Sequence, residues 1–232
     1  MPRARLLVLL LASAADSALA RKVLCLHGLG GSAFSFVEMH LKPLRGAAAA
    51  SYKDWRPVAW EFEAVDAAPV DTLSGGWWDY SPPGSTSVTA DELVKLDSAV
   101  QLVEETLMEG GFCGIFGFSQ GGMLASIVAA RAALGESTCK DLRFVVACGV
   151  ALPKPAEPLM HRLRDAPEAD CRPIATLFVL SKSDDDQPSA SGEALAGCFH
   201  DSQVIWHDRG HRLPEDYKQI VAFMDEVGPD MR

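Results

Sequence analysis

One stretch constrains the fold of this chain more than any other, and it reads GIFGFSQGGM at residues 114–123. It begins as a short apolar strand, passes through Gly-Phe-Ser-Gln-Gly and continues into small residues typical of a buried helix. Such a turn lifts the hydroxyl of its serine, here Ser119, clear of the sheet, because Gly117 and Gly121 have no Cβ to keep strand and helix apart. We expect a nucleophilic serine at a helix N-terminus, where free N–H groups favour negative charge. The alternative is a glycine-rich turn without chemistry.

Composition limits the class of protein. The 232 residues suffice for one α/β domain, and 48% of them are hydrophobic, so a large core is available. A net charge of −10 argues against a nucleic acid as partner. Of the six cysteines, Cys25, Cys113 and Cys148 lie in or beside apolar strand-like runs, and no Cys/His spacing suggests zinc. We therefore expect mostly reduced thiols and no metal.

Residues 1–20 have the layout of a secretory signal peptide. Arg3 and Arg5 precede the apolar run at 6–11, and Ala-Leu-Ala at 18–20 resembles a cleavage site. The run is too short to span a bilayer, so we expect no stable membrane span. An organelle transit segment and an uncleaved N-terminal helix are the alternatives. The remaining residues, 21–232, are predicted to form a single domain, which enters the secretory pathway if the segment is a signal.

Apolar strand patterns alternate with helical ones along the rest of the chain. This order predicts a mostly parallel sheet with helices on both faces. The strand that enters the serine turn belongs to this set. The other predicted strands are residues 23–26, 60–66, 142–150, 174–180 and 203–206, and the predicted helices include 34–44, ended near Pro43 and Gly46, 93–107, 193–198 and 216–227. Residues 153–173 contain five prolines and many charges, which indicates a surface segment or a small cap.

The first strand runs into His27-Gly28-Leu29-Gly30-Gly31. A glycine-rich turn after such a strand presents backbone N–H groups to a ligand. By this logic the N–H groups of Leu29 and Gln120 form an oxyanion hole, and each donor lowers the barrier by about 3–4 kcal/mol. His27 is interpreted as a structural residue that holds the loop rather than as the base.

A nucleophilic serine needs a base and an acid, which follow it in the order Asp, His on loops after strands. His211 lies between the last strand and the last helix and is the predicted base, with His207 as second choice. The acid should come from the loop after the 174–180 strand. Asp184, Asp185 and Asp186 all lie there, so position alone does not choose between them.

Trp77 and Trp78 stand together in a Gly-, Pro- and Ser-rich loop at residues 75–85. Two adjacent tryptophans on a loop are not expected to enter one core, so at least one is predicted to line the substrate cleft. Packing of the pair over a helix at the surface is the alternative.

These motifs, taken in order, resemble the FSH family of serine hydrolases, the fungal-type and ovarian-cancer-associated group. The likeness rests on Leu-His-Gly after the first strand, a V-D-A-x-P-like strand end, the tryptophan pair, Gly-Phe-Ser-Gln-Gly, the aspartate loop and Gly-His-x-x-Pro, and covers about residues 22–227. It implies an α/β-hydrolase fold without metal or organic cofactor. It also implies a small-molecule acyl ester or thioester as substrate. If residues 1–20 are not a signal peptide, it implies a location in the cytoplasm and nucleus, as for relatives.

The resemblance also bears on the acid. The family's acid loop looks like G-x-x-D-x-x-V-P, and alignment on Pro188 implies Asp184 as the acid. Ser181 stands here for the usual glycine and Gln187 for the usual valine, so Asp185 and Asp186 remain open. Gly30 and Gly31 also differ from the more polar residues that are common in the family.

The predicted function is hydrolysis of a carboxylic ester through an acyl-enzyme on Ser119, with His211 as base and Asp184 as acid. An acyl-protein-thioesterase-like enzyme shares the Gly-Phe-Ser-Gln-Gly-Gly turn and is the nearest alternative. A catalytically inactive binding module and a reaction without an acyl-enzyme are further alternatives.

Overall fold

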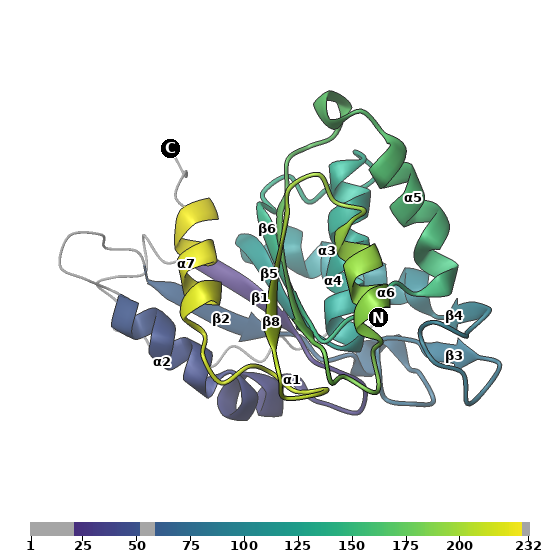
Figure 1. Cartoon of the computed structure of the whole chain (residues 1–232), viewed down its shortest axis with the longest axis horizontal. Helices are drawn as coiled ribbons and strands as arrows, with labels where there is room; N and C mark the ends of the chain where they lie inside the picture. Colours follow the sequence, from purple (N-terminus) through teal and green to yellow (C-terminus); the bar gives the residue numbers. More distant parts are fainter. Residues whose placement is uncertain (1–20, 52–58, 229–232) are drawn as a thin grey trace.

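The computed structural model describes residues 21–51 and 59–228, so the predicted leader at 1–20 lies outside the described residues. Within them, six parallel strands form a sheet in the order β2-β1-β5-β6-β7-β8 (Figure 1). The strands are β1 (Arg21–Leu26), β2 (Trp60–Ala64), β5 (Phe112–Phe118), β6 (Phe144–Cys148), β7 (Ala175–Ser181) and β8 (Ser202–His207). Each expected strand is present, and the parallel sheet is confirmed.

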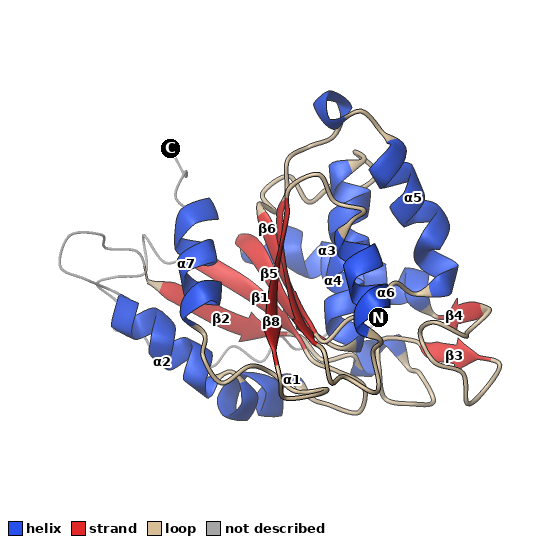
Figure 2. Cartoon of the chain, viewed as in Figure 1, coloured by secondary structure: helices blue, strands red, loops and turns tan. Residues whose placement is uncertain are grey.

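Helices cover both faces of this sheet (Figure 2). One layer consists of α1 (Ala33–Ser35), the π-helical turn η1 (Phe36–His40), α2 (Lys42–Ser51) and α7 (Lys218–Val227), and the other of α3 (Leu96–Gly110), α4 (Gln120–Ala133), α5 (Glu157–Asp165) and α6 (Ser189–Ala196). Neighbouring residues of a strand point to opposite layers. Ile115 therefore packs in the α3–α6 layer, whereas Phe116 packs beneath η1 and α7. Among the described helices, none has the length and apolar character to cross a bilayer.

The helix predicted at 34–44 does not end near Pro43 and Gly46 as expected. A short helix leads into the η1 turn, and α2 then begins at Lys42 and continues through Gly46 to Ser51. Pro43 is the second residue of α2. A proline is tolerated in the first turn of a helix because the N–H groups there have no partner within the helix.

The segment at 153–173 does not form a cap over the sheet edge that carries Ser119. It contains the 3-10 turns η3 (Lys154–Ala156) and η4 (Glu168–Asp170) on either side of α5. Met160 and Leu163 of α5 are fully buried in the main core, where α5 packs against α4. The prolines therefore bound a packed helix.

The loop at 75–85 includes a strand that the sequence did not indicate. β3 (Asp79–Ser81) pairs antiparallel with β4 (Glu92–Val94), after a 3-10 turn η2 (Ala68–Val70). Trp77 and Trp78 both have no exposed surface and both belong to the core between the sheet and the α3–α6 layer. The expectation that two adjacent tryptophans cannot enter one core is wrong.

All six cysteines lie within the described residues and are free thiols. Cys25 and Cys148 are fully buried, and burial strongly raises the pKa of both thiols.

Candidate active site

The turn between β5 and α4 places Ser119 in a strained conformation. Its φ of 54° and ψ of −122° lie outside the regions that residues with a side chain normally occupy. A Cβ on Gly117 would meet the carbonyl of Gly121, and a Cβ on Gly121 would meet the carbonyl of Leu26. The two glycines are therefore required for the approach of α4 to β1 and β5, which agrees with the role given to them from the sequence.

Ser119 is hydrogen-bonded to His211, and His211 to Asp184. The Nε2 atom of His211 lies 2.9 Å from Ser119 Oγ, and its Nδ1 atom lies 2.9 Å from Asp184 Oδ2. In the sequence, Asp184 lies 27 residues before His211 and Ser119 lies 92 residues before it. The loops that carry Asp184 and His211 leave the neighbouring strands β7 and β8, whose last residues, Ser181 and His207, are paired. The parallel sheet thus brings the loops together at one edge.

The backbone around Asp184 distinguishes it from its two neighbours. Its Oδ1 atom accepts hydrogen bonds from the backbone N–H groups of Asp186 at 3.0 Å and Gln187 at 2.8 Å. Only 2% of its side chain is exposed, whereas Asp185 and Asp186 are exposed residues. Both carboxylate oxygens of Asp184 are therefore held, one by the turn and one by His211.

The His211 ring is fixed from two sides. It lies against the Phe118 ring, with centroids 4.9 Å apart. The preceding Gly210 has a φ of +62°, and its N–H donates to the hydroxyls of Ser181 at 3.1 Å and Ser183 at 3.2 Å. The loop of the base is thereby joined to the loop of the acid.

His207, the second candidate for the base, has different contacts. Its Nδ1 atom accepts a hydrogen bond from the backbone N–H of Arg209 at 3.2 Å. Burial, together with the positive charge of Arg209, lowers its pKa. His211, and not His207, is the histidine that contacts Ser119.

His27 has the contacts of a structural residue. It is buried, its Nδ1–H donates to the carbonyl of Gly28 at 2.8 Å, and its Nε2 accepts from the N–H of Ala67 at 3.3 Å. This pattern requires the neutral imidazole with its proton on Nδ1. Burial lowers the pKa of His27, which favours the same neutral form. His27 therefore ties the loop after β1 to the segment after β2.

The two residues predicted to supply the oxyanion donors line the same pocket. Gln120 is the first residue of α4, so its N–H has no carbonyl partner within the helix. Gln120, Leu29, Ser119 and His211 all line a pocket of about 400 Å³. The oxyanion hole itself stays a prediction from the sequence.

Trp77 and Trp78 do not line this pocket, so the substrate-binding role expected of them has no support in the structure. Trp77 instead holds the loop after β1. Its Nε1–H donates to the carbonyl of His27 at 2.8 Å, and its ring lies 5.1 Å from the His27 ring. The side chain of Gln120 accepts from the Trp77 N–H at 2.8 Å and donates to the Trp78 carbonyl at 2.9 Å.

Sequence reasoning missed the residues on the far side of the pocket. These are Tyr80, Ser85, Thr86, Ser87 and Gln187. The Ser87 hydroxyl donates to the Gln187 side-chain oxygen at 2.8 Å, across 100 residues. The one signal in the sequence was Gln187 itself, because a polar residue stands there in place of the valine of the family pattern.

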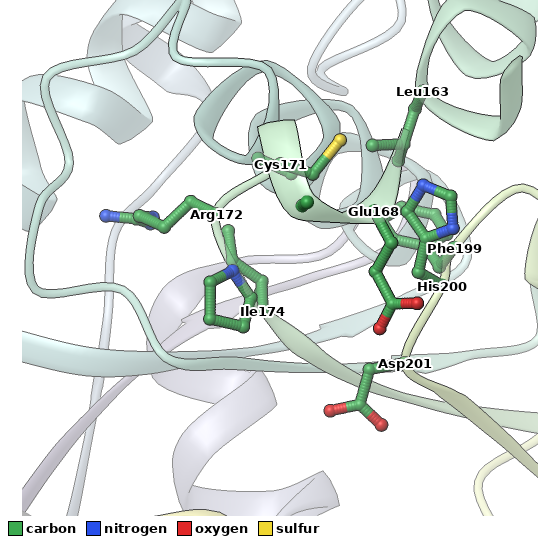
Figure 3. A pocket seen from close by; sticks show the side chains of 11 residues that line it. Leu163, Glu168, Cys171, Arg172, Ile174, Phe199, His200 and Asp201 are labelled. Atoms are coloured by element: carbon green, nitrogen blue, oxygen red, sulfur yellow. The ribbon is translucent and has the colours of Figure 1, made fainter. Parts of the chain in front are cut away.

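His211 also lines a second opening. It has a volume of about 550 Å³, and Phe118 and His211 line it together with the mostly apolar side chains of Phe36, Met39, Leu213 and Tyr217. A third pocket, also of about 550 Å³, lies elsewhere (Figure 3). Its residues Ile174 and Asp201 precede β7 and β8, so it is at the opposite end of the sheet from Ser119.

Within the described part of the chain, one group of side chains has metal-ligating atoms close together. Asp184, Asp186 and His211 each present such an atom within 4.8 Å of the others. The oxygens of Asp184 and the nitrogens of His211 already make hydrogen bonds. A cation would have to displace the contact between His211 and Asp184.

Solved structures identify the class of fold. Zea mays acyl-protein thioesterase 2 aligns with a TM-score of 0.63 at 20% identity, covering 90% of this chain and 94% of its own. A Bacillus cereus carboxylesterase aligns with a TM-score of 0.60 at 17% identity, covering 91% of both chains. The fold is that of an α/β-hydrolase, as the sequence predicted.

The family follows from the sequence comparisons. The chain belongs to the serine hydrolase (FSH1) family, whose model matches residues 18–223. Relatives include an esterase of Anopheles gambiae, 27% identical over 88% of this chain and 76% of its own length. The mouse esterase OVCA2 is 27% identical over 88% of this chain and 93% of its own. The resemblance to the ovarian-cancer-associated group is thus confirmed, and the protein is a serine hydrolase.

Proposed function

We propose that this protein hydrolyses carboxylic esters through an acyl-enzyme on Ser119. The observation that carries the proposal is the unbroken hydrogen-bonded chain from Asp184 through His211 to Ser119. In the first step His211 takes the proton of Ser119 while the Oγ atom attacks the ester carbonyl. Asp184 accepts the hydrogen bond from Nδ1–H, which keeps the lone pair of the imidazole on Nε2 and stabilises the cation that forms.

The N–H groups of Leu29 and Gln120 then stabilise the oxyanion, as their position beside Ser119 suggests. His211 gives its proton to the departing alcohol, and the C–O bond to that alcohol breaks. Water enters, His211 takes one of its protons, and the resulting hydroxide attacks the acyl-serine. The acid is released when His211 returns the proton to Ser119 Oγ. This cycle needs no metal or organic cofactor.

A fluorophosphonate probe tests the nucleophile. The wild-type protein should be labelled and should hydrolyse 4-nitrophenyl esters, whereas Ser119→Ala should lose both. Ser126→Ala is a matched control, because Ser126 lies in the same helix and its hydroxyl contacts only the backbone of its own turn. Undiminished labelling of Ser119→Ala would refute the assignment. Absence of labelling in the wild type would favour an inactive binding module.

A thioesterase is the second candidate. Its support is the likeness to an acyl-protein thioesterase, which extends over nine-tenths of the chain but concerns the fold. Oxygen and thiol esters of the same acyl group separate the two activities when their kcat/KM values are each divided by the rate of spontaneous hydrolysis. Mass spectrometry of Ser119 after rapid acid quench should show the acyl adduct. A reaction without an acyl-enzyme would leave Ser119 unmodified.

A further inference from the structure

The two openings beside His211 differ in their relation to the nucleophile. The smaller pocket contains Ser119 and the proposed donors Leu29 and Gln120. The larger groove contains His211 but not Ser119, and side chains such as Phe36, Met39, Leu213 and Tyr217 make it mostly apolar. The inference drawn from this difference rests on the proposed ester hydrolysis.

The chemistry of acyl transfer assigns a part of the substrate to each opening. His211 must protonate the oxygen of the leaving group, so this oxygen lies on the side of the imidazole. The leaving group then continues from His211 into the apolar groove. The acyl chain extends from the carbonyl carbon into the pocket that holds Ser119.

Polar side chains line part of the pocket for the acyl chain. Beyond the nucleophile and the oxyanion donors it is lined by Tyr80, Ser85, Thr86, Ser87, Asp186 and Gln187. A plain alkyl chain in this pocket would remove water from these groups without replacing their hydrogen bonds, which is unfavourable. These side chains therefore offer hydrogen-bonding partners to a polar acyl group.

Gln187 is the residue best placed to recognise a polar acyl group. It is buried to 9% exposure, and its side-chain oxygen accepts the hydroxyl of Ser87. Among the described residues none accepts a hydrogen bond from its NH₂ group, and the side chain lines the pocket. Its backbone N–H donates to Asp184 and its side-chain oxygen accepts from Ser87, so both the backbone and the side chain of Gln187 are anchored at the site.

We propose that Gln187 is a specificity-determining residue that donates a hydrogen bond to an oxygen of the acyl chain. The preferred substrates are esters of an ether-, hydroxy- or oxo-substituted acyl group with an apolar alcohol. Ser87 supports this selection, because its hydroxyl donates to the side-chain oxygen of Gln187 and the NH₂ group of the amide then faces the substrate.

Matched 4-nitrophenyl esters test the proposal. The ether esters 3-methoxypropanoate and 4-methoxybutanoate are compared with pentanoate and hexanoate, in which a methylene replaces the ether oxygen. The kcat/KM values are divided by the alkaline hydrolysis rates, which removes differences in intrinsic reactivity. One additional neutral hydrogen bond corresponds to a preference of about threefold to tenfold for an ether ester in the wild type.

Gln187→Met keeps the size of the side chain but removes the amide, and it should abolish this preference. The double variant Ser87→Ala/Gln187→Met removes the unpaired Ser87 hydroxyl as well and should behave in the same way even if the single variant folds poorly. Gln203→Met, on the exposed side of β8, makes the same substitution away from the site and should keep the wild-type ratio.

The outcomes separate this inference from the proposed function. Hydrolysis of all four esters without preference for the ether oxygen, or with the same ratio in the Gln187→Met and double variants, would overturn the role of Gln187 alone. No hydrolysis of any ester, together with no labelling of Ser119, would overturn the proposed function and this inference with it.

Discussion

The side-chain oxygen of Gln120 accepts a hydrogen bond from the backbone N–H of Trp77 at 2.8 Å, although the two residues are 43 positions apart. The amide end of the same side chain donates to the carbonyl of Trp78 at 2.9 Å. Gln120 thus lines the pocket beside Ser119 while its side chain holds the segment that supports His27. Gln120, the residue after the serine, therefore has a structural role in addition to its proposed role as an oxyanion donor.

Gln120→Ala should therefore lower both stability and activity. It leaves a buried N–H and a buried carbonyl without partners, which costs about 1–3 kcal/mol for each group. We expect a loss of about 2–4 kcal/mol in the free energy of unfolding, measured in urea, and a lower kcat. Gln101→Ala on the exposed face of α3, where the side chain contacts only Glu105, should change the stability by less than about 0.5 kcal/mol. Equal stability of the two variants would show that the hydrogen bonds from the Gln120 side chain to Trp77 and Trp78 do not stabilise the fold.

Replacement of each aspartate by asparagine should identify the acid. Asp184→Asn should lower kcat by about 10³–10⁴-fold, because an amide NH₂ facing Nδ1 favours the wrong tautomer of His211. Asp185→Asn and Asp186→Asn keep the backbone hydrogen bonds to Asp184 and should stay within about tenfold of the wild type. Steady-state kinetics on one ester decides the matter. A large loss of kcat in Asp185→Asn or Asp186→Asn, with little change in Asp184→Asn, would assign the role of the acid to that other aspartate.

His27 should make stability depend on pH. Burial lowers its pKa in the folded protein below the ordinary value of 6.5, so the unfolded chain takes up a proton first as the pH falls. Stability from this residue is complete above about pH 6.5 and is lost as the pH falls toward the lower pKa of the folded state. The free energy of unfolding of His27→Gln, measured in urea between pH 8 and 5, should fall less steeply than that of the wild type.

His207 provides the comparison for this measurement, since burial and Arg209 lower its pKa as well. His207→Gln should also flatten the profile, and the double variant should be flatter than either single one. A wild-type slope in His27→Gln would mean that His27 titrates alike in both states.

Two glycine-to-alanine changes should have opposite signs. Gly121→Ala places a Cβ against the carbonyl of Leu26, which forces α4 away from β1, and should cost about 3 kcal/mol or more. Gly46→Ala lies in α2, where nothing is within 4 Å of the added Cβ, and should stabilise the protein by about 0.5–1 kcal/mol. Thermal unfolding measures both. A stable Gly121→Ala protein would contradict the close approach at the serine turn.

The order of strands and helices could be predicted because the central strands β5, β6 and β7 are mostly apolar runs and β2 alternates apolar and polar residues, and both patterns are visible in sequence. The contact between Ser119 and His211 could be anticipated in the same way, since both residues follow the ends of parallel strands. The choice of Asp184 among three aspartates depends on a turn that directs two N–H groups to one carboxylate, and side-chain identity alone does not reveal that turn.

The tryptophan pair could not be placed from local pattern. The partners of Trp77 are Gln120 and His27, which lie 43 and 50 residues away, so its burial is decided by tertiary packing. The same holds for Gln187, whose contact with Ser87 spans 100 residues. Pro43 was misread for a different reason, because a proline marks the first turn of a helix as readily as its end.

The bond from the Gly210 N–H to the hydroxyls of Ser181 and Ser183 links the two loops that carry His211 and Asp184. A separation of these two loops breaks this bond, so the amide of Gly210 reports on how the loops are joined. Its rate of exchange with deuterium measures how often the loops separate, and this measurement needs no substrate.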